Sequence, residues 1–143
     1  MPKVNAVISE RVDDLPLLME QMQHMQLSAL LDKHFTPHGN WRGLTPGELS
    51  VLWLTHILSE GDHRLNQVEA WLEAHRITVR SCLSLKARRL DASDDHLAHL
   101  LDLLSDDANW ANFEQECAQT LIRTYALVPR VHRADSTSAS NYG

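Results

Sequence analysis

Residues 45–61 read Thr-Pro-Gly-Glu-Leu-Ser-Val-Leu-Trp-Leu-Thr-His-Ile-Leu-Ser-Glu-Gly, and the other elements can be placed around them. Thr45 and Glu48 have the spacing of a capping box, and Pro46 suits the first helical position. Leucine, valine and isoleucine recur every three or four residues and also fill the positions between. A helix that is apolar on so much of its circumference should lie at the centre of a bundle. Gly61 then ends the helix with a left-handed cap.

Two side chains of this helix carry a ring nitrogen. Trp53 lies among the apolar positions, so we expect a buried aromatic whose removal destabilises the fold. His56 lies in the same stripe, and we expect its ring to donate a hydrogen bond to a backbone carbonyl, because a buried polar group needs a partner.

The preceding residues predict two shorter helices. Asp13 or Asp14 can cap the first of them, in which leucines and methionines recur at helical spacing. A second helix follows, with Leu27, Leu30, Leu31 and Phe35 on one side. Residues 36–43 contain two glycines and a proline and therefore predict a loop.

The following residues predict further helices. One carries Leu65, Val68 and Leu72 and ends near His75. Residues 76–89 suggest another short helix, although the β-branched run 77–79 has low helix propensity. Ser93 caps the next helix, and Ser105-Asp106-Asp107 repeats that start signal for the last one. We therefore predict an all-α bundle of about five to seven helices.

The C-terminal residues predict a change to extended structure. Pro129 fixes its own φ and disfavours helix at Val128, so a short strand is expected from there. Asp135 follows that strand. A carboxylate at a strand end suits a magnesium ligand in a metal-dependent nuclease, and Asp-Ser-Thr also suits an ordinary turn or helix cap. The predicted division is a helical domain at 12–127 and a strand-forming segment at 128–143.

Charge is distributed unevenly along the chain of 143 residues, whose formal net charge is −6. The stretch 76–89 holds five cations and no acid, namely Arg76, Arg80, Lys86, Arg88 and Arg89. The stretch 91–116 holds eight acids and no lysine or arginine. A basic run is either a solvated face or a phosphate-binding one, and its acidic neighbour must avoid nucleic acid.

The composition excludes several classes of protein. No apolar run approaches the roughly 20 residues that span a membrane, and the first residues lack the apolar segment of a signal peptide. Cys82 and Cys117 have no CxxC spacing, so we expect two reduced thiols in the cytoplasm. The nine histidines form no recognisable metal motif, and we expect scattered core or surface histidines.

Five stretches resemble DDE transposases of bacterial insertion sequences, in the superfamily of insertion sequence four. They are Asn40 to Leu44, Trp53 to Asn66, Ser93 to Leu97, Leu104 to Asp107 and Arg133 to Ser140. The longest is the most specific. The first four resemble the helical N-terminal domain of these enzymes, and the last resembles their first acidic motif. The flanks of that motif, His132 and Ala134, are less bulky and apolar than is usual there.

This resemblance implies a function. Such transposases have a ribonuclease-H-like core with three acidic Mg²⁺ ligands, of which Asp135 would be the first. The other two are not in this chain, so we expect a truncated transposase that binds magnesium weakly and cuts no DNA. Its helical part would bind element ends in DNA transposition through the five cations of 76–89, and could form a homodimer. The alternatives are a helical protein-interaction module and a non-functional remnant.

Overall fold

A computed structural model describes residues 6–128 of the chain. These residues form seven α-helices, two short 3₁₀ turns and no strand. The elements are α1 (Leu15–His24), α2 (Leu27–His34), α3 (Pro46–Glu60), η1 (Leu65–Gln67), α4 (Val68–Ala74), α5 (Arg76–Leu83), η2 (Arg89–Ala92), α6 (Asp94–Leu103) and α7 (Asp107–Thr124). The all-α prediction is confirmed for this part of the chain. The strand predicted from Val128 onward falls on 129–143, outside the described residues.

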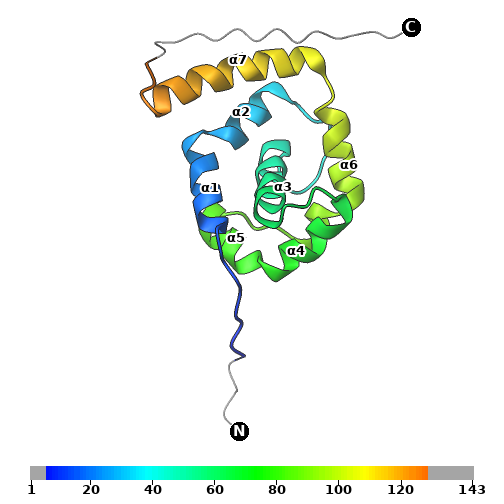
Figure 1. Cartoon of the computed structure of the whole chain (residues 1–143). Helices are drawn as coiled ribbons and strands as arrows, with labels where there is room; N and C mark the ends of the chain where they lie inside the picture. Colours follow the sequence, from blue (N-terminus) through cyan, green and yellow to red (C-terminus); the bar gives the residue numbers. More distant parts are fainter. Residues whose placement is uncertain (1–5, 129–143) are drawn as a thin grey trace, which may run out of the picture.

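Helix α3 occupies the centre of the bundle, as its sequence predicts. Figure 1 looks along α3 and shows α1, α2, α4, α5 and α6 around it. Leu49 and Leu52 of α3 are fully buried, and they join a core that includes Leu15, Met19, Val68, Leu72, Val79, Leu97 and Leu100. Both ends of α3 also match their predictions. Thr45 and Glu48 form the capping box, and Gly61 ends the helix in the left-handed region.

The start of α3 is fixed against α2 by a close approach. A Cβ atom on Gly47 would lie 2.0 Å from the carbonyl oxygen of Ser28, so no larger residue fits there without movement. The carboxylate of Asp32 accepts hydrogen bonds from the Gly47 amide at 2.7 Å and from the Thr45 hydroxyl at 2.6 Å. Asp32 therefore acts as a second cap on α3, supplied by a neighbouring helix.

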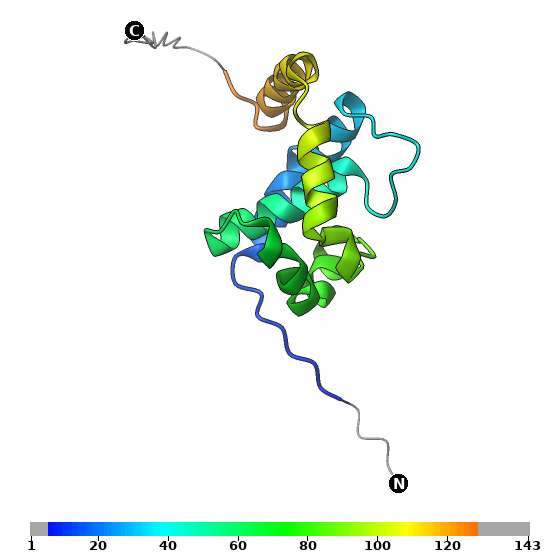
Figure 2. The same cartoon turned by 90° about the vertical axis from the view of Figure 1, so that its right-hand side faces the viewer.

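A second cluster of buried side chains attaches α7 to the bundle. Phe35 is fully buried, and its ring lies 5.3 Å from that of Trp110 and 6.2 Å from that of Phe113. Helix α7 packs chiefly against α2. Figure 2 shows α7 at one end of the molecule and α6 passing in front of the bundle, with the loop between α2 and α3 beside it. That loop covers the predicted range 36–43.

Three local expectations are wrong. Asp14 does not cap α1 through its side chain; its carboxylate instead accepts from the Ser59 hydroxyl at 2.6 Å. Trp53 is half-buried, because α3 turns that side chain toward the edge of the core. His56 is buried with Nδ1 unpartnered among the described residues, and its ring meets the ring of Trp71 at a centroid distance of 5.3 Å. Burial lowers the pKa of His56 and so favours the neutral ring.

The two cysteines are free thiols, and both are half-buried. Burial raises the pKa of the Cys117 thiol, which disfavours the reactive thiolate. Within residues 6–128, no helix is both long and apolar enough to cross a membrane.

Candidate nucleic-acid interface

The basic segment, defined here as residues 76–89, spans α5, the connection 84–88 and the first residue of η2. The weak helix propensity of 77–79 is overcome by packing, because Val79 is fully buried in the main core. Ser84 then takes a left-handed conformation with φ of 55° and ends α5. Beyond it Ala87 is buried, which returns the chain to the core before η2. The predicted short helix is confirmed.

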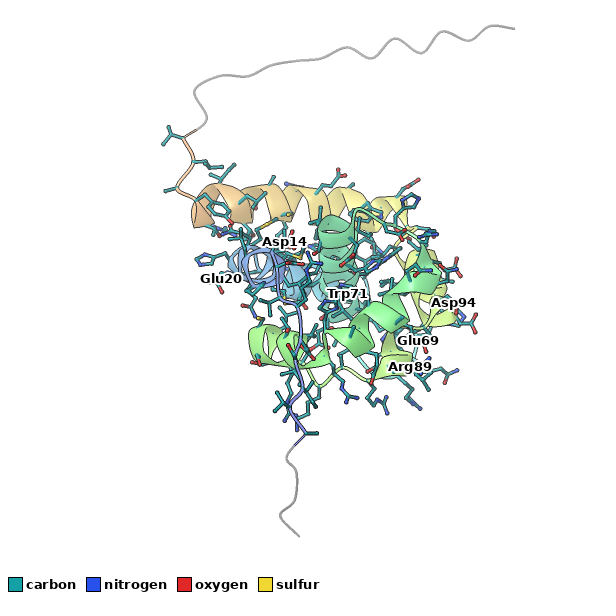
Figure 3. All side chains as sticks on the ribbon, turned by 60° about the horizontal axis from the view of Figure 1, so that its bottom comes forward. Asp14, Glu20, Glu69, Trp71, Arg89 and Asp94 are labelled. Atoms are coloured by element: carbon teal, nitrogen blue, oxygen red, sulfur yellow. The ribbon has the colours of Figure 1, made fainter. Side chains whose placement is uncertain are left out.

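All five cations of the basic segment are exposed, but they differ in their partners. Those with a carboxylate partner are Arg76 with Glu73 at 3.7 Å, Arg88 with Asp91 at 3.4 Å and Arg89 with Glu69 at 2.6 Å. Figure 3 shows the last of these pairs, which joins η2 to α4. Arg80 and Lys86 are in no ion pair within the described part of the chain. These two side chains are therefore the ones most available to an incoming anion.

The N-terminus of α5 is already occupied by a carboxylate from the start of the chain. Glu10 accepts from the amides of Ile77 and Thr78 at 2.9 and 2.8 Å and from the Thr78 hydroxyl at 2.7 Å. Burial acts to raise the pKa of Glu10, but these hydrogen bonds outweigh it, and the pKa lies below its usual value. A phosphate would thus meet exposed side chains of α5 and not its terminal amides.

Asp91 fixes the position of Arg88, the residue before η2. Its carboxylate is buried and accepts from the Arg88 backbone amide at 2.7 Å, which shapes the turn. The Arg88 guanidinium contacts the same carboxylate at only 3.4 Å and is 75% exposed on its side chain. Because this contact is long and Asp91 keeps the hydrogen bond from the Arg88 amide, the exposed guanidinium can turn to a phosphate while the buried carboxylate retains a partner.

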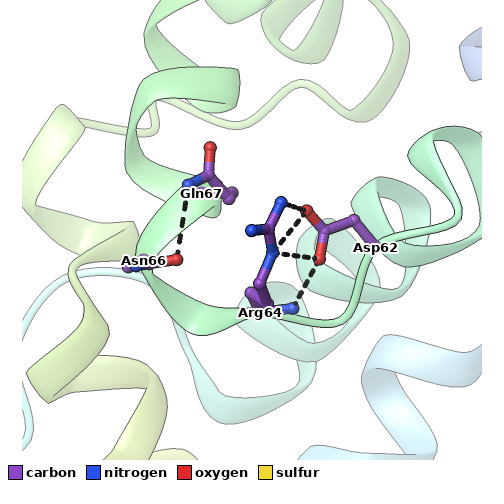
Figure 4. Close-up of polar contacts among 4 residues, drawn as sticks. All are labelled: Asp62, Arg64, Asn66 and Gln67. Atoms are coloured by element: carbon purple, nitrogen blue, oxygen red, sulfur yellow. Dashed lines mark hydrogen bonds and ion pairs between the residues drawn. The ribbon is translucent and has the colours of Figure 1, made fainter.

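The stretch 53–66, which carries the most specific part of the resemblance, forms the second half of α3 and the turn after it. In that turn, the Arg64 guanidinium binds the Asp62 carboxylate through two parallel hydrogen bonds of 2.8 and 3.0 Å (Figure 4). The hydrogen bonds from Arg64 lower the pKa of Asp62 to about 2. Arg64 is therefore engaged in shaping the turn, and it is not a sixth candidate for phosphate.

Asp135, the predicted catalytic and magnesium-binding residue, lies outside the described residues. Within residues 6–128, no three side chains of the histidine, cysteine, aspartate or glutamate type converge to hold a metal ion.

Sequence reasoning missed the carboxylates that accompany the basic segment. Glu69 and Glu10 reach it from 20 and 67 residues away in the chain. Both are acids next to ordinary helical patterns, and no local signal marks them as partners of a basic run.

Protein-family models, curated proteins and solved structures were compared with the chain, and none of them matches it. The resemblance to DDE transposases thus stays a prediction from the residues quoted above.

Proposed function

We propose that this chain binds duplex DNA through its basic segment, as the helical N-terminal part of a DDE transposase that contributes to end binding or assembly in DNA transposition. The observation that carries the proposal is the exposure of all five cations on a stretch with no acid of its own. The resemblance supplies the biological context. The contacts would fall on phosphates, and they would position the protein without reading the sequence.

The ion pairs of the basic segment determine how many phosphates it can neutralise. Arg80 and Lys86 bind phosphate without losing a partner, which gives a slope of log Kobs against log salt of about −1.8 on duplex DNA. If Arg76, Arg88 and Arg89 also exchange their carboxylates for phosphates, the slope steepens to about −4.5. The measured slope therefore reports whether the three ion pairs open on binding.

Fluorescence anisotropy of a labelled duplex of about 20 base pairs, titrated from low to moderate salt, tests the proposal. We expect Arg80→Ala with Lys86→Ala to weaken binding and to flatten the salt slope by about 1.8. The matched control is Arg42→Ala with Arg123→Ala, which removes the same charge from two exposed arginines outside the basic segment that are in no ion pair within residues 6–128. Equal effects of the two double variants, or affinity that ignores salt, would contradict the proposal.

No DNA cleavage is proposed for this chain. In-line phosphoryl transfer needs two metal ions held about 3.5 to 4 Å apart, and Asp135 alone cannot hold them. We expect the purified chain, with magnesium or manganese, to leave duplex DNA uncut. Nicking that disappears in Asp135→Ala would show instead that a working site forms.

The second candidate function is a helical protein-interaction module that does not bind DNA. One observation favours it: three of the five cations already have acidic partners, so the basic segment is partly neutralised within the fold. Under this alternative, both double variants above bind DNA as weakly as the parent chain does. The anisotropy titration therefore separates the two functions. A non-functional remnant would differ only in expression.

A further inference from the structure

A wide surface cleft lies between the α2–α3 loop and α6, two segments whose ribbons can be followed in Figure 2. Its volume is about 1190 Å³. Single small-molecule sites usually measure about 300 to 1,000 Å³, so this cleft is large enough for a segment of a polymer. Many of its lining residues are exposed, among them His38, Arg42, His99 and Asp102. An open cleft of this kind suits an extended chain lying across it.

One wall of the cleft is a pair of rings held in place by backbone hydrogen bonds. Trp41 Nε1 donates to the Leu44 carbonyl at 2.7 Å, and His96 Nδ1 donates to the Asp91 carbonyl at 2.9 Å. The two rings lie against each other at a centroid distance of 4.5 Å. Because both are fixed before any ligand arrives, they form a preorganised aromatic surface.

The loop that carries Trp41 is itself held close to η2. Gly43 has φ of +81°, and a Cβ atom there would lie 2.3 Å from Asp91 Oδ1. Only glycine allows this approach, so the loop and the turn before α6 act as one rigid side of the cleft. Leu90 also lines the cleft and has 73% of its surface exposed, so it offers apolar area to a ligand.

The charge of the cleft argues against an anionic ligand. Arg42 and Arg88 are its only lysine or arginine residues, against four aspartates, which are Asp91, Asp95, Asp102 and Asp106. Asp91 is engaged by Arg88, and Asp106 caps α7 by accepting from the Asn109 amide at 2.8 Å. Asp95 and Asp102 are exposed and are in no ion pair within the described part of the chain. Seven residues apart on α6, they lie on one face of the helix.

We propose that this cleft binds an extended segment of a partner protein in which arginine or lysine side chains alternate with apolar side chains. The cations lie between Asp95 and Asp102 and over the face of Trp41, where carboxylates and an aromatic ring both attract them. The apolar side chains of the segment cover the apolar residues of the cleft lining, which are Leu90, Pro37 and Leu103. This interaction goes beyond the proposed DNA binding, because Arg88 is the one cation of the basic segment that also lines the cleft, whereas Arg80 and Lys86 do not line it.

The probe is a fluorescein-labelled peptide of alternating leucine and arginine, titrated with the purified chain. Two matched peptides, leucine with glutamate and serine with arginine, test the charge and the apolar contribution separately. We expect the leucine–arginine peptide to bind tightest and the leucine–glutamate peptide not to bind. We expect the indole N–H signal of Trp41 to move in the NMR spectrum on binding.

The variant that tests the cleft is Asp95→Asn with Asp102→Asn, for which we expect a roughly five- to tenfold loss of affinity, about what two exposed charge pairs supply. The control is Glu60→Gln with Glu114→Gln, which removes two exposed carboxylates outside the cleft and should change affinity less than about twofold. Circular dichroism confirms that both variants fold. Equal losses in the two variants, absence of leucine–arginine binding, or tighter binding of single-stranded oligothymidine in competition with the peptide would overturn the proposal.

Discussion

Helices α3 and α7 differ in how much of their surface the fold uses. Helix α3 has 15 residues, of which eight are buried, and it contacts helices on several sides. Helix α7 is longer, with 18 residues, but only Phe113 and Thr120 are buried, and its main neighbour is α2. Length therefore says little about importance to the core. How much a helix contributes to the core depends on the width of its apolar surface, because only a helix that is apolar on most sides buries apolar area on each side when other helices surround it.

Helices α3 and α7 also differ in how cooperatively they are held in the fold. Side chains of α3 contribute to both buried clusters, through Leu49 and Leu52 in one and Val51 in the other. Helix α7 contributes one buried ring, that of Phe113, to one cluster. We therefore expect α3 to unfold only with the whole bundle, whereas α7 can open as a local unit.

The largest expected effect is at the centre. Leu52→Ala removes a fully buried side chain and should lower the free energy of unfolding by about 2 to 5 kcal/mol. Leu58→Ala on the same helix, where 57% of the side chain is exposed, should change it by less than about 0.5 kcal/mol. Urea denaturation followed by circular dichroism measures both. Similar losses in the two variants would contradict the central position of α3.

The next effect concerns the attachment of α7. Phe113→Ala removes the ring that packs on Phe35 and His34, and we expect a loss of about 2 kcal/mol, limited by the free energy that docks the helix. Hydrogen exchange should then accelerate in α7 while the amides of α3 keep their protection. Uniform acceleration in both helices would show that they unfold together.

A smaller effect is expected from the second cap on α3. Asp32→Ala removes the acceptor for the Gly47 amide and the Thr45 hydroxyl, and should cost about 1 to 2 kcal/mol. Asp32→Asn keeps one oxygen acceptor, so it should cost less. Thermal unfolding of the three proteins is the measurement. A loss in Asp32→Asn as large as that in Asp32→Ala would indicate that charge, and not hydrogen bonding, is what α3 needs.

The smallest effect is a pH dependence at the α2–α7 contact. Hydrogen bonds from Lys33 and then His34 lower the pKa of Glu116 below its ordinary value near 4.5. Because the folded pKa is lowered, the stabilisation is present above that ordinary value and is lost as the pH falls through the lowered one. We expect hydrogen exchange in α7, corrected for the intrinsic rate, to accelerate across this range. Glu116→Gln should remove most of the change, and an unaltered pH profile in that variant would place its origin elsewhere.

Much of the helical pattern was predictable because its signals are local. The capping box at Thr45, the cap at Ser93 and the end at Gly61 each involve residues within a turn of one another. The prediction that Asp14 caps α1 was wrong because a competing partner, Ser59, lies 45 residues away in the chain. The expected hydrogen bond from the His56 ring to a backbone carbonyl was wrong for a related reason. The ring packs against the ring of Trp71, which no local pattern indicates.

The candidate interface was predictable only in part. The five cations of residues 76–89 are exposed, as a charge run usually is. The ion pairs that three of them form, with Glu73, Asp91 and Glu69, were not predicted. Arg80 and Lys86 are the two cations of the segment without an acidic partner in residues 6–128. The cleft beside α6 was not predicted either, because Trp41 and His96 come from segments far apart in the chain.

The sequence by itself determined that the part of the chain described by the structure, residues 6–128, is helical, where most of its helices start and end, and that α3 lies at the centre of the bundle. These follow from the order of apolar and capping residues along the chain, which acts over one or two turns. Only the tertiary structure decided which charges remain available and where a cleft opens. Those properties depend on side chains brought together across long stretches of chain, such as Glu10 at the start of α5 or Gly43 against Asp91, and the distances between them arise when the helices pack.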